Sequence, residues 1–425
     1  MKILWSRTRG ACVLMFVSIW PCVAAGQSAL SLTEAIELTR LHHPSSAGFE
    51  AESTAAQLEA EFSALPPGFA LETELENFAG SGSVSGVRAL ETTVRLATTL
   101  ELGGKRQLRR HVGDAQIDRL SADQAVRRLD LSAEVARRFI HVLSDQELLT
   151  TTQRATELAR STRDVVKQRV EAGAASPAML SRAEIALARA GIEYEHAEHE
   201  LMSSRVKLTS MWGDAEAKFS SAQGRLFTLP DLESFDAYRT RLQANPELLR
   251  FDSDARLQDA KMQLATAKRL PDIDVGAGVR RLETMDDQAF VASFSVPLGT
   301  RRRADLERRA TQAERTRIEQ ERKAQAVELQ ATLFDLYQEL VHARTEAEAL
   351  RTTIQPQAAA MLRTTDEGFR AGRFSQLELA DAQRELLDIE RNAVESAAKF
   401  HTLLVEIHRV TGAAPNALPL GRTTP

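Results

Sequence analysis

Seam positions recur at alternating steps of three and four residues in two stretches of the chain, and the second stretch repeats the first at a constant offset of 199. In the first stretch they are Leu180, Ala183, Leu187, Ala190, Tyr194, Ala197, Leu201, Ser204, Leu208 and Met211. In the second they are Leu379, Ala382, Leu386, Ile389, Ala393, Ser396, Phe400, Leu403, Ile407 and Val410. This spacing predicts two coiled-coil helices, ending at the C-cap glycines Gly213 and Gly412. The duplication predicts a fold built twice.

A tight corner precedes each of these helices. The first corner is Arg169-Val-Glu-Ala-Gly173-Ala-Ala-Ser176, and the second is Phe369-Arg-Ala-Gly372-Arg-Phe-Ser375. Glycine permits the positive φ that reverses a helix, and serine can cap the helix that follows. We therefore predict two helical hairpins with tips near 171–177 and 370–376. The serines either only make the turn or also contact a partner.

Long helices lead up to both corners. The distance from Gly103 to Gly173 is 70 residues and that from Gly299 to Gly372 is 73, so a continuous helix would reach about 100 Å. Pro356 lies inside the second of these stretches and predicts a kink there. Heptads support a helix up to this proline, at Leu329, Leu333, Leu336, Leu340, Ala343, Ala347, Leu350 and Ile354.

Each half begins with a shorter helix that ends at proline. The first starts at a capping box, Ser31-Leu-Thr-Glu34, and runs to about Leu65, and the second runs from about Phe235 to Leu270. The mature chain, 27–425, is thereby predicted to be one unit made of two repeats, 31–213 and 235–412.

Strand-like alternation follows each short helix, near 69–101 and 272–298. Apolar residues such as Leu71 alternate with polar ones such as Glu72. Strands of this kind are typical of outer-membrane barrels, but a soluble hairpin packed on helices gives the same alternation. The four predicted strands cannot close a membrane barrel alone, since the smallest barrels have about eight strands. A membrane interpretation therefore requires several chains to share one barrel.

Composition agrees with narrow helical packing. Aromatic residues are 5% of the chain and charged residues 27%, which favours long helices with small seam residues over one thick core. The formal net charge of -5 gives no basic footprint for nucleic acid. The sequence holds no Ser/His/Asp arrangement and no glycine-rich phosphate loop, so we expect neither an enzyme nor a cofactor.

The N-terminus, residues 1–26, has the features of a secretory signal peptide: basic residues, a short apolar core and small residues at a cleavage site. Both cysteines lie in this segment, so the mature chain would contain no thiol. The residues before Cys22 are not the small ones that precede a lipidated cysteine, which makes lipidation the less favoured alternative. No later apolar run is long enough for a membrane helix.

The signal peptide, the duplicated helix–strand–strand–helix–helix order and the corners resemble the TolC-like outer-membrane efflux factors over nearly the whole mature chain. Leu102-Gly-Gly-Lys-Arg106, Pro356-Gln-Ala and Gly372-Arg-Phe-Ser375 are most similar to the outer-membrane subunits of heavy-metal cation (cobalt-zinc-cadmium type) tripartite efflux systems. The resemblance implies a mainly α fold with β strands. It implies a homotrimer in the Gram-negative outer membrane, with a coiled-coil α-helical barrel in the periplasm and a 12-stranded β-barrel to which each chain gives four strands.

The same resemblance implies partners for the corners. In this family an Arg-x-x-x-Gly-x-x-Ser/Thr pattern at the periplasmic tips meets the hairpin of a periplasmic adaptor, a membrane fusion protein. The adaptor connects to an inner-membrane transporter, here of the resistance-nodulation-division type. In the second corner Phe369 takes the place of the arginine and precedes Arg370. The residues implied in docking are Arg169, Gly173, Ser176, Arg370, Gly372 and Ser375.

Acidic side chains six and nine residues after the second corner glycine constrict the tunnels of this family. Here these residues are Glu378 and Asp381, so a trimer would place six carboxylates around the periplasmic aperture. Such a ring repels itself, attracts cations and can bind a divalent ion. Two solvated acids on a helix surface are the alternative.

Two further groups carry candidate chemistry. His196 and His199 have the spacing of a metal-ligand pair on a helix, but the seam at Ala197 and Leu201 places them on the solvated face, and we assign no metal site there. The basic runs near 105–110 and 301–303 either contact anionic headgroups of the outer-membrane lipid or form solvated helix surface.

These inferences together predict a passive exit duct of a tripartite efflux pump, with heavy-metal cations as the expected cargo. Drug or organic-compound efflux and type I secretion are the alternatives within the family. Outside it, a periplasmic coiled-coil scaffold would share the heptads but not the strands. An adaptor subunit usually has one hairpin per chain.

Overall fold

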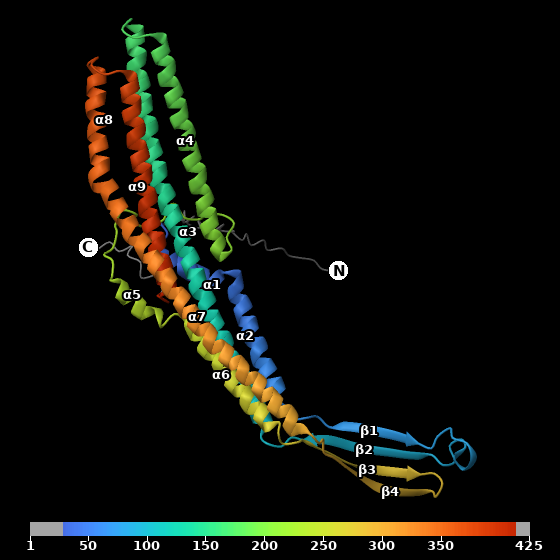
Figure 1. Ribbon diagram of the computed structural model, residues 1–425. Coiled ribbons are helices and arrows are strands. Elements are labelled where there is room, and N and C mark those ends of the chain that lie inside the picture. The colour runs from blue at the N-terminus through green and yellow to red at the C-terminus, as the bar shows by residue number, and fades with distance from the viewer. Residues whose placement is uncertain (1–28, 414–425) are drawn as a thin grey trace, which may run out of the picture.

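The computed structural model describes residues 29–413, so the predicted signal peptide and both cysteines lie outside the described part. A layer of long helices carries a four-stranded sheet at one end (Figure 1). The α-helices are α1 (Leu32–His42), α2 (Pro44–Ser63), α3 (Lys105–Glu171), α4 (Pro177–Thr209), α5 (Phe235–Leu242), α6 (Pro246–Ala267), α7 (Thr300–Ala349), α8 (Gln355–Arg370) and α9 (Gln376–Val410). The strands are β1 (Ala70–Glu76), β2 (Glu91–Leu100), β3 (Ile273–Leu282) and β4 (Asp287–Ser295). The predicted mainly α fold with β strands is confirmed.

Proline determines where several helices break. Pro44 and Pro246 each occupy the first turn of a new helix, where a missing N–H costs nothing. The side chains of His43 and Asn245 cap these helices. The helices predicted from Ser31 and from about Phe235 are therefore two helices each, α1 with α2 and α5 with α6.

The kink predicted at Pro356 takes the form of a π-helical segment, Leu350–Ile354, between α7 and α8. Because proline has no N–H and its ring clashes with the carbonyl four residues back, the preceding turn widens. The equivalent helix of the first repeat, α3, has no proline and continues for 67 residues without a break.

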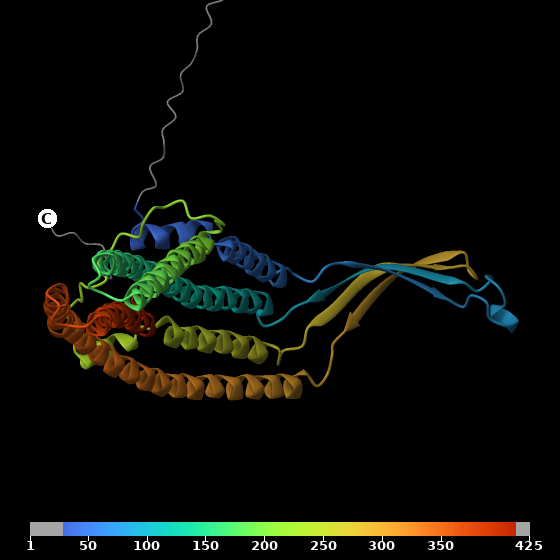
Figure 2. The ribbon, with the colours of Figure 1, turned by 90° about the horizontal axis from the view of Figure 1, so that it is seen from above.

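Four helices lie side by side along most of the layer (Figures 1 and 2). Near the hairpin tips the order of packing is α4, α3, α9 and α8, and nearer the sheet it is α2, α3, α6 and α7. The two repeats are thus interleaved, since α3 of the first packs on α6 and α9 of the second. The layer ends in two edges, one formed by α4 and α2 and the other by α7 and α8.

The predicted seams are the faces that pack against neighbouring helices. Leu208, Leu379 and Phe400 are completely buried. The connection between α4 and α5 crosses the layer at mid-height, and we call residues 214–234 of it the waist segment. It adds Phe219 and Leu226 to the main hydrophobic cluster. The thickest core of the molecule therefore lies at the waist.

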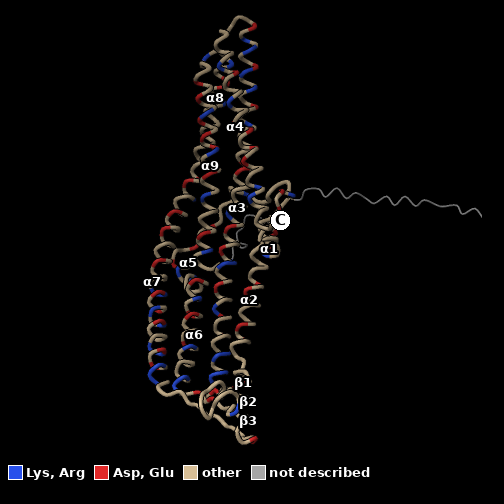
Figure 3. Tube along the Cα trace, turned by 90° about the vertical axis from the view of Figure 1, so that its right-hand side faces the viewer, with Lys and Arg blue, Asp and Glu red and all other residues tan. Residues whose placement is uncertain are grey.

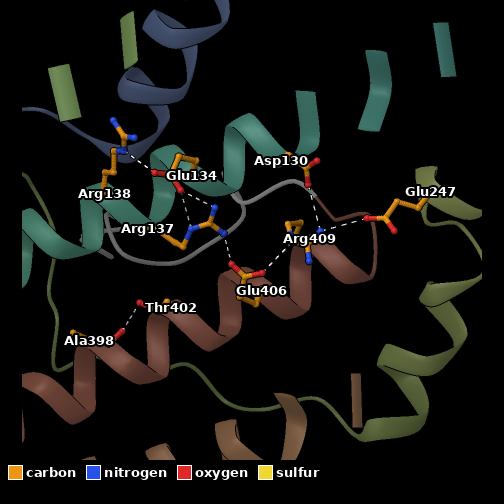
Figure 4. Close-up of polar contacts among 9 residues, drawn as sticks. All are labelled: Asp130, Glu134, Arg137, Arg138, Glu247, Ala398, Thr402, Glu406 and Arg409. Carbon is orange, nitrogen blue, oxygen red and sulfur yellow. Dashed lines mark hydrogen bonds and ion pairs between the residues drawn. The ribbon is translucent and has the colours of Figure 1, made fainter. Parts of the chain in front are cut away.

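A network of charged side chains joins the two repeats beside this core (Figure 4). Arg137 of α3 pairs with Glu134 and with Glu406 of α9. Arg409 then pairs with Glu406 and, at 3.4 Å, with Glu247 of α6. Networks of partly buried pairs hold their geometry better than isolated surface pairs, which fixes the relative height of α3, α6 and α9.

The sheet is antiparallel, with the strands in chain order. The register places Val94, Val279 and Phe290 beside one another, so one face is apolar, and Phe290 is 95% exposed on it. On the opposite face Arg95 pairs with Glu72, and Arg280 pairs with acidic residues of both β1 and β2. The predicted division into an apolar and a polar face is confirmed.

Among the described residues no helix covers either face of this sheet (Figure 2). The alternative of a soluble hairpin packed on helices is therefore wrong. Within residues 29–413 no helix combines the length and the apolar character required to cross a bilayer.

Candidate docking tips and gate

Both corners have the backbone that their glycines predict. Gly173 has φ of 69° and Gly372 has φ of 74°, the left-handed region that glycine adopts without strain. The N–H of Gly173 donates to the Val170 carbonyl, and that of Gly372 donates to the Phe369 carbonyl, so Val170 and Phe369 are equivalent. The residue equivalent to Arg169 is consequently Gly368, and the assignment of Phe369 to the arginine position was wrong by one residue.

Gly368 is required by the packing of the second corner. A Cβ on this glycine would lie 2.0 Å from the Phe374 ring, which covers it. In the second corner, therefore, glycine stands where the first corner has arginine, and the Phe374 ring packs over this glycine.

Arg169 of the first corner contacts the second corner. Its guanidinium donates to the carbonyls of Phe369 and Arg370, both at 2.7 Å. It also lies over the Phe369 ring, 4.6 Å from the centroid. Those two carbonyls belong to the last turn of α8, where the helix dipole favours a cation, and the Phe369 carbonyl also accepts from the Gly372 N–H. Arg169 therefore joins the two hairpins within one chain.

The two corner serines differ. Ser375 accepts from the N–H of Glu378 through its side chain, as predicted for a cap. Ser176 makes no side-chain cap, and the predicted capping is wrong for it. Pro177 follows Ser176 and opens α4 with a residue that has no N–H to satisfy, so one donor fewer needs a partner there. Ser176 is exposed at the tip.

The predicted gate residues are both exposed on α9. The Glu378 carboxylate accepts from the backbone N–H of Ser375 at 2.7 Å and from its hydroxyl at 2.8 Å, which completes a capping box. These hydrogen bonds lower the pKa of Glu378 and keep it charged. Asp381 pairs with Arg384, one turn farther along. The two acids share a face of α9, but of the two only Glu378 has no cationic partner within residues 29–413.

Further polar contacts hold the hairpins together below the corners. The Gln376 amide donates to the Met179 carbonyl at 3.0 Å, and the Gln383 amide donates to the Thr162 hydroxyl at 2.9 Å. A groove of about 660 Å³ lies beside them between α4 and α9, with α3 as its floor. Five arginines line this groove: Arg154, Arg182, Arg189, Arg384 and Arg391.

The other candidate groups are resolved by their contacts. His196 and His199 are exposed, and no group of three or more metal-ligating side chains occurs in residues 29–413. The Lys105 ammonium donates to the Leu270 carbonyl and to Asp272, each at 2.7 Å. Arg106 and Arg109 likewise donate to carbonyls at the end of α2.

Lys105 is buried and Arg109 half-buried in these contacts, so for these two residues both alternatives, lipid anchor and solvated surface, are wrong; Arg106 remains exposed. The run 301–303 is exposed at the start of α7, where Figure 3 shows basic residues gathered.

Sequence patterns gave no sign of the contacts between the hairpins. Arg169 and Phe369 are 200 residues apart, and Thr162 and Gln383 are 221 apart. The one sequence feature that could have indicated these contacts is the missing arginine in the second corner, because Arg169 of the first corner binds there.

The outer membrane efflux protein family model matches residues 44–214 and 237–413. The chain belongs to this family: it is a TolC-like outer-membrane channel with a periplasmic helical extension. It is 27% identical over 323 residues to the cobalt-zinc-cadmium resistance protein CzcC of Cupriavidus metallidurans, covering 76% of this chain and 77% of that protein.

Two solved structures share its fold. A membrane protein from Pseudomonas aeruginosa superposes with a TM-score of 0.73 at 18% identity, covering 90% of each chain. CusC superposes with a TM-score of 0.71 at 13% identity, covering 90% of this chain and 92% of that one. The interpretations as a periplasmic scaffold or an adaptor subunit are thereby set aside.

Proposed function

We propose that the protein is the exit duct of a tripartite efflux pump and conducts its cargo passively from the periplasm to the exterior. The observation that carries this proposal is the incomplete closure of the single chain. The sheet exposes an apolar face with no helix over it among the described residues. The helical layer ends in two edges, of which the α7 edge is covered only at the waist, where α5 packs on it. A ring of identical chains would pair the free edges of the helical layer and of the sheet at the same time.

A homotrimer is the assembly we propose. Each chain supplies four strands, so three chains supply twelve and pass the minimum of about eight strands for a membrane barrel. The apolar face, with Phe290 and Phe294, would then contact lipid. The charged face, with Arg95 and Arg280, would line the water-filled interior.

Heavy-metal cations are the proposed cargo. The similarity to CzcC, a cobalt-zinc-cadmium resistance protein, supports this choice over organic compounds. A wide duct need not select its cargo, so selection is assigned to the inner-membrane transporter, proposed to be of the resistance-nodulation-division type.

Docking of a periplasmic adaptor at the corners is the proposed opening step. The exposed residues Gly173, Ser176 and Gly372 would meet the adaptor hairpin, together with Arg370 and Ser375. The contacts of Arg169, Gln376 and Gln383 hold the two hairpins close, so adaptor binding must break them to widen the aperture.

Metal tolerance of cells tests the function. A strain without this gene should lose tolerance to cobalt, zinc and cadmium and regain it from the full-length gene. Loss of tolerance only to organic compounds would transfer the cargo assignment to drug efflux. Unchanged tolerance to both, with a purified chain that stays soluble without detergent, would contradict the exit duct.

Planar bilayers test the gate. The double variant Glu378→Gln with Asp381→Asn should raise single-channel conductance and weaken block by divalent cations, because it removes the proposed carboxylate ring. Glu395→Gln is the matched control, since it neutralises an exposed acid of the same helix far from the tip and keeps both gate acids. Equal conductance and equal block in wild type and double variant would exclude these acids as the gate.

A further inference from the structure

The groove between α4 and α9 has the size and the apolar floor of a small-ligand site. Its volume of about 660 Å³ lies within the range of roughly 300–1,000 Å³ that is typical of ligand pockets. Helix α3 runs between the two walls and forms the floor (Figure 1). Ile185 of the α4 wall is 55% exposed to the groove side of the chain. The larger apolar side chains of the lining are Leu158, Ile185, Leu386 and Leu387.

The rim of the groove carries an excess of positive charge. Its lining contains five arginines but only three acids, so two positive charges are uncompensated. Arg182 and Arg189 lie about two turns apart on α4 and have no acidic partner within residues 29–413. The other three arginines are paired: Arg154 with Glu390, Arg391 with Glu193, and Arg384 with Asp381.

A buried amide oxygen lies at the end of the groove nearer the tip. A cavity of about 190 Å³ continues the groove there and shares Arg182, Ala186 and Gln383 with it. Gln376 lines this cavity and is only 9% exposed, and its Oε1 has no hydrogen-bond partner within residues 29–413. Because a buried acceptor without a donor is unfavourable, a ligand with an N–H or O–H group would complete this end.

We propose that the groove binds an amphipathic organic anion. The apolar body of the ligand lies on the α3 floor, and its carboxylate, sulfate or sulfonate group lies between Arg182 and Arg189. Arginine suits such groups because its planar guanidinium can donate two parallel hydrogen bonds to their oxygens. Burial of the apolar body adds to the affinity, so the site favours an organic anion over a free inorganic one.

The ligand would hold the two hairpins together. Its contacts come from both walls, with Arg182 and Ile185 on α4 and Gln376 and Leu386 on α9. A ligand shifts an equilibrium toward the state that it binds more tightly, and widening of the aperture separates these walls. Binding of the anion therefore favours the closed aperture, a consequence that rests on the opening step proposed above.

Protection of an introduced cysteine tests the site in the detergent-purified full chain. The native cysteines are both in the predicted signal peptide, so Ala186→Cys places a single thiol in the lining. Anilinonaphthalene sulfonate should protect this thiol from a maleimide, and its neutral analogue phenylnaphthylamine should need a concentration at least about tenfold higher. Gln153→Cys is the matched control, because it is exposed on α3 outside the lining and should react equally with and without either compound.

Removal of the two unpaired charges gives a second measurement. Arg182→Gln with Arg189→Gln should raise the half-protecting concentration of the sulfonate about tenfold and leave that of the neutral analogue unchanged. Arg160→Gln, at an exposed arginine of α3 outside the lining, is the control and should change neither. In planar bilayers the sulfonate on the periplasmic side should lower the open probability of wild type and leave that of the double variant unchanged.

Three outcomes would overturn the proposal. Equal protection by the two compounds, or equal protection in wild type and double variant, excludes an anion site. Protection without any change in open probability excludes the effect on the aperture. Loss of adaptor binding in the double variant, with no protection by the sulfonate in wild type, assigns the groove to the adaptor instead. None of these outcomes contradicts the exit duct, which the metal tolerance of the deletion strain tests separately.

Discussion

At the scale of single residues, the corners show how one substitution changes the role of a motif. Arg169 and Gly368 occupy the same place in the two repeats, yet the arginine of one corner closes the last turn of the other. The cation accompanies the negative end of the α8 dipole through two carbonyls, and Phe369 adds its ring. The difference between the two corners therefore allows the first hairpin to bind the second within one chain.

Arg169→Ala should open the isolated channel. Losing a cation at a helix C-terminus costs on the order of 1 kcal/mol, which predicts about a fivefold higher open probability per chain in planar bilayers. Arg160→Ala, which removes an exposed arginine from the same helix, should change nothing. If Arg169 acts only in adaptor docking, its variant will conduct like wild type and fail only in adaptor binding.

His401 predicts a loss of stability in acid. It is fully buried on α9, its Nε2 lies 2.9 Å from the Leu226 carbonyl of the waist segment, and its Nδ1 has no partner. Burial lowers the pKa of His401 to about 4, below its usual value of 6.5. The unfolded chain then binds the proton more tightly, so stability is complete above about pH 6.5 and declines as the pH falls toward 4.

The expected loss is about 3 kcal/mol per chain over that range. Burial also lowers the pKa of His408, one heptad along α9, and adds to the effect in the same direction. Thermal unfolding of wild type and His401→Leu between pH 7 and 4 measures it. The variant should be less stable at pH 7 and much less sensitive to pH, and parallel curves would refute the assignment.

At the scale of elements, the sheet depends on two glycines of β3 that face its polar side. A Cβ on Gly278 would lie 2.2 Å from the Val94 carbonyl oxygen, and one on Gly276 would lie 2.5 Å from the Ser293 hydroxyl. Glycine in a strand marks a close approach of backbone or a bend. Bare backbone at these positions lets β2, β3 and β4 curve toward the charged face.

Gly278→Ala should cost about 1–3 kcal/mol through overpacking and reduce the amount of heat-modifiable trimer in outer-membrane fractions. Gly191→Ala on α4 is the control, because nothing lies within 4 Å of its built Cβ and alanine is the better helix former. Equal trimer yields for the two variants would show that the strand tolerates a side chain there.

At the scale of the whole molecule, the two repeats are similar in order but not independent. α3 packs on α6 and α9, β2 pairs with β3, and the Arg137–Glu406 pair crosses between the halves. Each repeat alone would leave one side of α3 or of α9 without its neighbour.

Neither half should therefore fold alone. Separately produced 27–213 and 235–425 should be degraded by protease under conditions in which the full chain resists it, since the buried seam of each half would face water. Mixing the two halves should restore resistance. A protease-resistant single half would mean that the repeat, and not the full chain, is the folding unit.

Local sequence patterns suffice to predict the helices and strands and their order along the chain. Periodicity of three and four, alternation of two, and glycine and proline at fixed places are local properties of the backbone, and they set the hairpins, the strands and the kink before Pro356. The family resemblance rests on the same local features, and the match to 44–214 and 237–413 agrees with it.

Which polar groups meet depends on the three-dimensional fold. Arg169 lies 200 residues from Phe369, and Lys105 is 167 residues from Asp272, so no local pattern pairs them. The sequence predicts an acid near the tip at Glu378, but the corner geometry directs its carboxylate back to the backbone N–H of Ser375. Periodicity determines which face of a helix is buried, whereas the neighbour on that face depends on how the whole chain closes.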